Sequence, residues 1–328
     1  MYLLTAALLF PLALTAQTAA PVPIIFDTDL GNDIDDALAL AVIHALESRG
    51  EARLLAVTIT KDNRWSAPFA DVLNHFYGRP NIPIGVVRNG KTPDDAPYTR
   101  IPVERKTAQG GPLYARRLNP EGQSPEAAGL IEKILGSQTD ASVVIVQVGF
   151  STNLARLLER PGAVDLIRRK VRFLSIMAGE FPAGKPEYNV RIDVEAARKV
   201  FSGWPTDVVF SGFEIGLAIQ YPARSIESDF RYTANHPIVD AYRAYKKMPY
   251  DRPTWDLTSV LYAVRPDRGY FSLSPPGRVQ VDADGRTKLD PDPKGRHRYL
   301  IAGEVERART LEALVQLASQ PPGAGVKR

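Results

Sequence analysis

The chain has 328 residues, of which 41 are Lys or Arg and 37 are Asp or Glu, so its net charge is +4. Hydrophobic residues make up 44% and charged residues 24%, fractions that are typical of a globular protein and exclude a disordered chain or a coiled coil. The absence of cysteine excludes a disulfide scaffold, a thiol nucleophile and a Cys-ligated metal site. Because the positive excess is small and dispersed, we expect no nucleic-acid partner.

The N-terminal segment predicts a secretory signal peptide over residues 1–20. Residues 3–16 are apolar, and the small or polar residues 17–20 follow them. The run is interrupted by Pro11 and is too short for a membrane span, which needs about 20 residues. Since no Lys or Arg precedes the run, the alternative is a buried first strand or helix. After cleavage we expect a periplasmic or secreted chain without a membrane anchor, a location that suits a protein lacking cysteine.

Short apolar runs alternate with helical patterns along the rest of the chain. The expected elements, in chain order, are a strand at residues 23–26, a helix at 33–48, a strand at 54–60, a helix at 66–77, a strand at 82–87, a helix at 125–135, a strand at 142–148, a helix at 152–158, a strand at 171–177, a helix at 194–201, a strand at 207–210 and a last helix at 304–319. Residues 88–124 are polar and rich in Gly and Pro, which predicts a long loop. Helical patterns dominate from 211 to 264, and residues 269–301 predict a hairpin around Asp284-Gly285.

Strands separated by helices over this length predict an α/β fold. We expect a mostly parallel, doubly wound central sheet with helices on both faces. Neither an internal repeat nor a low-complexity linker interrupts the pattern, so we expect one domain over residues 21–320 and a frayed tail over residues 321–328.

An acidic stretch follows the first predicted strand. Five aspartates fall within ten residues: Asp27, Asp29, Asp33, Asp35 and Asp36. In an open α/β sheet this is the edge where ligands bind. Two carboxylates about 4 Å apart repel each other by about 4 kcal/mol at an effective dielectric constant of 20, so such a cluster favours a bound cation. Oxygen ligands without nearby His or Cys favour Ca²⁺ or Mg²⁺ over zinc.

Helix capping is the alternative explanation of the acidic stretch. Acidic residues in the first turn of a helix are stabilised by its dipole, which accounts for Asp33, Asp35 and Asp36. It does not account for Asp27 and Asp29, which lie two residues apart at the end of the strand and point to the same side. The sequence therefore favours a metal site.

The same stretch resembles a known signature. Residues 27–37, DTDLGNDIDDA, resemble the Asp-x-Asp-Pro-Gly-x-Asp-Asp motif of the inosine–uridine nucleoside hydrolase family, with Leu30 in place of Pro and two extra residues before the Asp-Asp pair. Other segments follow in the family's order: residues 148–155, VGFSTNLA, resemble Gly-x-Leu-Thr-Asn-x-Ala; Glu187-Tyr188-Asn189 with residues 193–197, DVEAA, resemble Glu-Phe-Asn and Asp-Pro-Glu-Ala-Ala; Trp255-Asp256 stands where the family often has His-Asp; and Asn63 matches an Asn placed against the ribose.

This resemblance implies a nucleoside hydrolase that binds one Ca²⁺ and cleaves the N-glycosidic bond of a small nucleoside-like substrate. The implied metal ligands are Asp29, Asp36, the backbone carbonyl of Val148 and Asp256. Because of the two extra residues, Asp33 is the alternative to Asp29. The ion would lower the pKa of a water molecule, and Asp29 would take its proton as catalytic base.

The resemblance also implies residues for the substrate. Asp35 would accept a hydrogen bond from a ribose hydroxyl and take part in catalysis, and Glu187, Asn189 and Asn63 would hold other sugar hydroxyls. A group of carboxylates suits the positive charge that develops on the sugar in the transition state. Family members are often homodimers or homotetramers, which leaves a homo-oligomer as an expectation.

Activation of the leaving group is the point of departure from the family. Purine-type members use a His beside the last metal-binding Asp, and this chain has Trp255 there, which could stack on a base or form a wall of the pocket. His236 precedes a helix whose family counterpart lines the pocket, so it is a candidate for contact with the leaving group. Two other functions stay open: a haloacid-dehalogenase-like phosphatase, suggested by Asp27-Thr28-Asp29, and a non-catalytic ribosyl- or nucleoside-binding protein.

Overall fold

The computed structural model describes residues 20–323. The predicted signal peptide lies outside the described residues apart from Ala20, as do residues 324–328 of the predicted tail. None of the helices among the described residues is long and apolar enough to cross a membrane.

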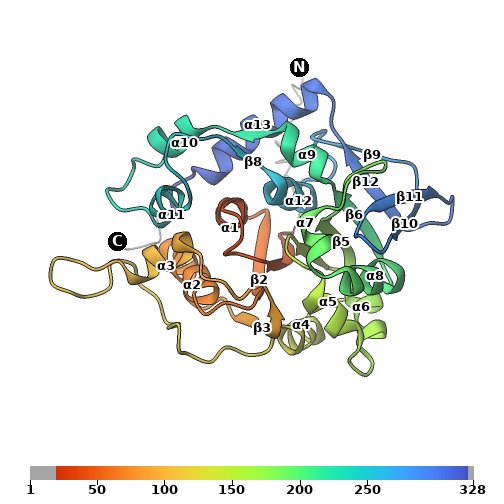
Figure 1. Cartoon of the computed structure of the whole chain (residues 1–328), viewed down its shortest axis with the longest axis horizontal. Helices are drawn as coiled ribbons and strands as arrows, with labels where there is room; N and C mark the ends of the chain where they lie inside the picture. The colour runs from red at the N-terminus through yellow and green to blue at the C-terminus, as the bar shows by residue number, and fades with distance from the viewer. Residues whose placement is uncertain (1–19, 324–328) are drawn as a thin grey trace, which may run out of the picture.

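The described residues form an alternation of strands and helices (Figure 1). The strands are β1 (Val22–Thr28), β2 (Ala52–Lys61), β3 (Ile84–Lys91), β4 (Val143–Gln147), β5 (Val171–Met177), β6 (Asp207–Ser211), β7 (Gln220–Tyr221), β8 (Arg252–Pro253), β9 (Ser272–Leu273), β10 (Gly277–Val281), β11 (Thr287–Pro291) and β12 (His297–Ile301). The helices are α1 (Asp35–Ser48), α2 (Ser66–Phe76), α3 (Pro97–Glu104), α4 (Ala127–Gly136), α5 (Thr152–Leu158), α6 (Ala163–Lys170), α7 (Tyr188–Ile192), α8 (Val194–Gly203), α9 (Phe213–Ala218), α10 (Ala223–Ser228), α11 (Pro237–Tyr245), α12 (Trp255–Val264) and α13 (Glu304–Ala318).

The central sheet is mostly parallel. Its strands follow the order β11-β10-β12-β6-β5-β4-β1-β2-β3, and every pair from β12 to β3 is parallel. The chain runs from β1 outward through β2 to β3, then returns to β4 on the other side of β1 and continues through β5 to β6. The strand order thus reverses between β1 and β4, and this is where open α/β sheets bind their ligands.

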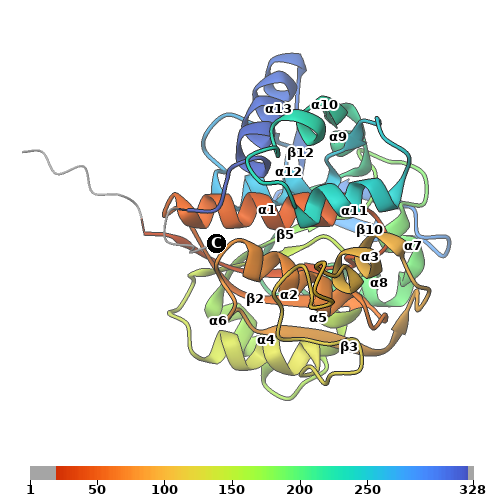
Figure 2. The same cartoon turned by 90° about the vertical axis from the view of Figure 1, so that its left-hand side faces the viewer.

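Helices cover both faces of the sheet (Figure 2). The side chains of β1 alternate: Ile24 and Phe26 join the core formed with α1, α2, α12 and α13, whereas Ile25 joins the core formed with α4, α5, α6 and α8. This two-residue alternation is what an extended strand buried on both faces requires. The predicted single α/β domain with a doubly wound, mostly parallel sheet is confirmed.

Three helices of the described residues were not expected from the sequence: α3, α6 and the five-residue α7. The segment 88–124, expected to be a loop throughout, contains α3, whose Pro97 and internal Pro102 disguise its helical pattern. The helix α6 is only 8 residues long and has three basic residues in its last turn. By contrast, the hairpin expected around Asp284-Gly285 is present as the antiparallel pair β10 and β11.

Candidate active site

An acidic cavity opens at the carboxyl ends of β1, β4 and β5, next to the point where the strand order reverses. It has a volume of about 70 Å³, enough for several water molecules. Its lining residues come from six segments of the chain: Asp29, Asp33, Asp35, Asp36, Val148, Met177, Glu187, Tyr188, Asn189, Phe213, Trp255 and Asp256. The fold therefore gathers most of the predicted site residues into one cavity.

The loop between β1 and α1 is held from several sides. Gly31 has a φ of +127°, and a Cβ there would lie 2.6 Å from Cδ of Lys61, so the turn needs glycine. The Gly31 N–H donates to the Tyr98 hydroxyl across 2.5 Å, and that hydroxyl donates to the Asp33 carbonyl. The unexpected helix α3 thus serves the site, because its Tyr98 fixes the loop that carries the aspartates.

Three carboxylates from distant segments are buried together. Asp29 follows β1, Asp36 lies in the first turn of α1 and Asp256 lies in the first turn of α12, and they are 4%, 1% and 5% exposed. Burial raises the pKa of Asp29 to about 7, against the lowering effect of a hydrogen bond from Asn32. Burial, followed by the charges of neighbouring carboxylates, raises the pKa of both Asp36 and Asp256 well above the usual range.

Only one of the two carboxylate oxygens of Asp36 has a hydrogen-bond partner among the described residues. Its Oδ1 accepts a hydrogen bond from the Thr28 hydroxyl. Its Oδ2 is buried and has no hydrogen-bond partner among the described residues. A buried carboxylate oxygen without a partner is costly, so this atom is suited to a ligand that supplies positive charge.

Asp33 and Asp35 differ from those three because they pair with Arg252. The Arg252 Nη2 lies 2.8 Å from Asp33 Oδ2 and 2.9 Å from Asp35 Oδ1. The Asp33 side chain is 46% exposed, and the Tyr245 hydroxyl also donates to its Oδ1 across 3.0 Å. Of the two alternative metal ligands, Asp29 is thus the buried one beside Asp36 and Asp256, whereas Asp33 lies at the rim in an ion pair.

The Glu187-Tyr188-Asn189 segment forms another wall of the cavity. The Glu187 carboxylate caps α7, accepting hydrogen bonds from the N–H groups of Asn189, Val190 and Gly179. Burial raises the pKa of Glu187 to about 7, although these backbone hydrogen bonds lower it. The Asn189 side-chain amide donates to the Val148 carbonyl across 2.7 Å, so the carbonyl proposed as a metal ligand faces the same cavity.

Aromatic side chains line the cavity beside the carboxylates. The Trp255 indole stacks on Phe213, with ring centroids 5.2 Å apart, and its Nε1 donates to the Phe213 carbonyl across 2.9 Å. Tyr188 also lines the cavity and packs against Phe150. Tyr188 and Phe213 were not singled out from the sequence, although Tyr188 stands inside a quoted motif.

The cavity is not lined by Asn63, His236 or Asp27. The Asn63 amide donates to the carbonyls of Pro93 and Asp94 and holds that loop. His236 caps α11 by accepting from the Ile238 N–H, and its ring packs against Phe76. Asp27 accepts hydrogen bonds from Thr58 and Asn153, which tie β1 to β2 and α5.

A family model decides which family the chain belongs to. The model described as inosine-uridine preferring nucleoside hydrolase matches residues 24–313, most of the chain. The chain belongs to this family. It is therefore a nucleosidase, an enzyme that hydrolyses the N-glycosidic bond of nucleosides, and its base preference is left open.

Solved structures of nucleoside hydrolases share the fold. A plant nucleoside hydrolase is 21% identical with a TM-score of 0.67, covering 92% of this chain and 100% of its own. A purine-preferring ribonucleoside hydrolase from Gardnerella vaginalis is 18% identical with a TM-score of 0.69, covering 90% and 98%. An inosine-uridine preferring nucleoside hydrolase from Bacillus anthracis is 17% identical with a TM-score of 0.67, covering 91% and 99%. A comparison with curated protein sequences finds no significant match.

Nucleoside hydrolases depend in general on a metal ion. The side chains of the acidic cavity are of a kind that could bind one. In residues 20–323, no three His, Cys, Asp or Glu side chains already stand in the arrangement of a metal site. The chemistry of the donors nevertheless fits a hard divalent cation, because Asp29, Asp36 and Asp256 are buried together and Asp36 Oδ2 is unengaged. Binding would require these carboxylates to ionise and draw closer.

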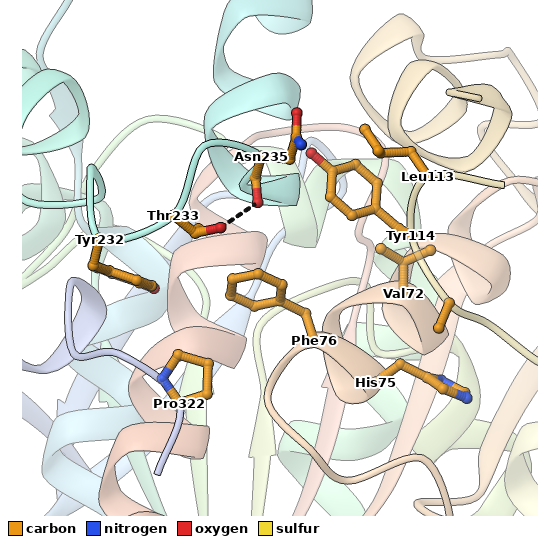
Figure 3. Close-up of a pocket in the computed structure, with 10 residues that line it drawn as sticks. Val72, His75, Phe76, Leu113, Tyr114, Tyr232, Thr233, Asn235 and Pro322 are labelled. Atoms are coloured by element: carbon orange, nitrogen blue, oxygen red, sulfur yellow. Dashed lines mark hydrogen bonds between the residues drawn. The ribbon is translucent and has the colours of Figure 1, made fainter. Parts of the chain in front are cut away.

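A larger cavity lies elsewhere in this nucleoside hydrolase (Figure 3). It has a volume of about 320 Å³, and its walls come from α2, from the loop after α3 and from the segment before α11. Phe76 and Tyr114 are among its lining residues. Within the described part of the chain, no residue that lines this cavity also lines the acidic cavity. No carboxylate of residues 20–323 is among its lining residues, in contrast to the acidic cavity.

Proposed function

We propose that this nucleosidase is a secreted or periplasmic, Ca²⁺-dependent hydrolase of ribonucleosides or related N-ribosyl compounds, with water as the nucleophile. The observation that carries the proposal is the burial of Asp29, Asp36 and Asp256 in one cavity. These residues come from the loop after β1, from α1 and from α12. Like charges are not brought together in this way unless a cation or a proton compensates them.

The ion would be held by these three carboxylates and by the Val148 carbonyl. Oxygen ligands of this kind favour calcium or magnesium over zinc, and the resemblance to the family favours calcium. When bound, calcium would supply Lewis-acid activation of a water molecule and an anchor for sugar hydroxyls.

Asp29 is the proposed general base. In the metal-free protein burial raises the pKa of Asp29 to about 7. A bound cation would lower that pKa, so that Asp29 would be ionised and able to accept a proton at neutral pH. The Asn32 amide donates to Asp29 Oδ2 across 2.8 Å and fixes the orientation of the carboxylate.

Sugar hydroxyls would be held by Asp35, Glu187 and Asn189, which line the cavity beside Asp29. The carboxylates there would also stabilise the positive charge that develops on the sugar as the N-glycosidic bond breaks. Asn63 and His236 take no part in this proposal, because their side chains are engaged outside the cavity.

The leaving base would lie against Trp255. Its indole is flat, lines the cavity and is fixed by stacking on Phe213, so it offers a surface for a planar base. Trp255 cannot protonate the departing base as a His would. We therefore expect Trp255 to bind the base by contact and not to act as a general acid.

The test is incubation of the protein with a panel of purine and pyrimidine nucleosides, in calcium or in excess chelator. Free sugar is expected only with calcium, and it should be lost in Asp36→Ala but kept in the control Asp165→Ala, whose side chain is 78% exposed on α6. Sugar release that persists in chelator would overturn calcium dependence. Phosphate release from p-nitrophenyl phosphate would favour the phosphatase, and tight ribose binding without turnover would favour the binding protein.

The proposed location has its own test. Expression of the full chain in a bacterium should give a periplasmic or medium fraction whose N-terminal sequence begins close to residue 21. A cytoplasmic product that retains Met1 would overturn it. The oligomeric state stays a prediction, which light scattering of the purified protein will settle.

A further inference from the structure

Arg252 connects two carboxylates of the acidic loop to the segment that carries Asp256. Besides its ion pair with Asp33, the guanidinium makes two contacts with one oxygen of Asp35: Nη2 lies 2.9 Å and Nε 3.2 Å from Asp35 Oδ1. Arg252 belongs to β8 and lies four residues before Asp256, which is in the first turn of α12. Neither the family motifs nor the charge pattern of the sequence pointed to Arg252.

Aromatic rings fix the orientation of this guanidinium. Its central carbon lies 5.3 Å from the ring centroid of Tyr245 and 5.0 Å from that of Trp255. Its Nη1 donates to the Tyr245 hydroxyl across 3.3 Å. A planar donor that is stacked on rings and directed at two acceptors depends on its shape as well as its charge, so Lys would not replace it.

Asp35 is held through both of its oxygens. Oδ1 accepts from Arg252, and Oδ2 accepts from the backbone N–H of Asp256 across 3.3 Å. The residue is 1% exposed and still lines the cavity. Because each carboxylate oxygen can accept more than one hydrogen bond, Asp35 keeps acceptor capacity toward the cavity while its orientation is set from behind.

We infer that Arg252 is a positioning residue that holds Asp35 in the orientation in which its carboxylate accepts a sugar hydroxyl. This inference rests on the proposed role of Asp35 in sugar binding. An interaction of this kind is made with the bound substrate as well as with the transition state, so its loss raises KM more than it lowers kcat.

The experiment compares Arg252→Lys and Arg252→Met with Arg224→Met, which removes an exposed arginine on α10. Steady-state kinetics in calcium are expected to show KM raised about tenfold in both Arg252 variants, the scale of a lost hydrogen bond to a charged group, with a smaller change in kcat. Arg224→Met should match the wild type. Thermal unfolding is followed in parallel, and if Arg252→Met does not fold, Arg252→Lys decides.

A double-mutant cycle separates positioning from a general structural role. In the Asp35→Asn background, Arg252→Lys should add almost nothing to the dissociation constant for D-ribose measured by calorimetry, whereas in the Glu187→Gln background it should keep its full effect. Two outcomes would overturn this inference while leaving the proposed function intact. One is an equal effect of Arg252→Lys on the dissociation constant in both backgrounds. The other is a KM of the Arg252 variants that equals the KM of Arg224→Met. A wild-type protein that releases sugar from no nucleoside would instead overturn the proposed function, and the inference with it.

Discussion

The Asn32 side-chain amide lies 2.8 Å from Asp29 Oδ2 and donates a hydrogen bond to it. Lys61, on the neighbouring strand β2, donates in turn to Asn32 Oδ1 across 3.0 Å and to the Thr92 carbonyl across 2.7 Å. Asn32 belongs to the acidic loop, between Gly31 and Asp33. The acidic loop thus supplies a side chain that orients the proposed base.

Replacement of Asn32 by Ala should therefore impair the reaction without unfolding the protein. Loss of one hydrogen bond to a carboxylate is expected to lower kcat/KM about tenfold. Steady-state kinetics test this, with the exposed Asn119→Ala as the matched control. If both variants retain wild-type kcat/KM, Asn32 does not orient the base.

Gly149 gives a steric test of the same carboxylate. A Cβ at Gly149 would lie 2.5 Å from the Asp29 backbone N and 2.9 Å from its Cβ. We expect Gly149→Ala to displace Asp29, to lower the free energy of unfolding by about 1–3 kcal/mol and to lower kcat/KM. Gly136→Ala is the control, because a Cβ there meets nothing within 4 Å. An equal kcat/KM of the two variants would show that the reaction tolerates a displacement of Asp29.

His236 should prove structural. Its side chain caps α11 and packs against Phe76 and Phe230, and burial lowers its pKa to about 3, so it is neutral at physiological pH. His236→Ala is expected to lower the free energy of unfolding by about 2–4 kcal/mol while leaving KM unchanged at a temperature where the variant is folded. Thermal unfolding and kinetics measured together test this, and a raised KM in a folded variant would return His236 to the substrate site.

Local patterns were enough to predict the sheet, and with it the acidic loop and the edge of the sheet where it lies. A strand buried on both faces and the Asp-rich turn after it are set by residues close in sequence, as in β1 and the start of α1. The resemblance added Asp256, whose place beside Asp36 depends on the packing of α12 against α1. The sequence failed where a long-range contact decides which way a side chain points.

Asn63, His236 and Arg252 illustrate that failure. Asn63 turns to the 93–95 loop and His236 to Tyr232 and α11, partners that no motif specifies. Arg252 was overlooked because its partners, Asp33 and Asp35, lie more than two hundred residues earlier in the chain. The helix α3 was missed because its prolines are typical of loops, although Tyr98 within it supports the acidic loop.

The pH dependence of calcium binding follows from the acidic cavity. The pKa of Asp29 rises from an unfolded-state value near 4 to about 7 in the folded protein. In the metal-free protein, the contribution of Asp29 to the free energy of unfolding is therefore fully present below pH 4. It is lost as the pH rises through 7, because the buried carboxylate must then ionise. Calcium needs the ionised form, so its stabilising effect should grow over the same range.

Thermal unfolding with calcium or chelator at pH 5 and pH 8 tests this dependence. At a calcium concentration about 100 times the dissociation constant, we expect Tm to rise by about 5–10 °C at pH 8 and by much less at pH 5. Asp256→Asn removes an ionisable carboxylate from the cavity, so at pH 8 calcium should add little to the Tm of this variant. An equal gain in Tm at both pH values, or a gain that survives Asp256→Asn, would contradict a calcium site built from these carboxylates.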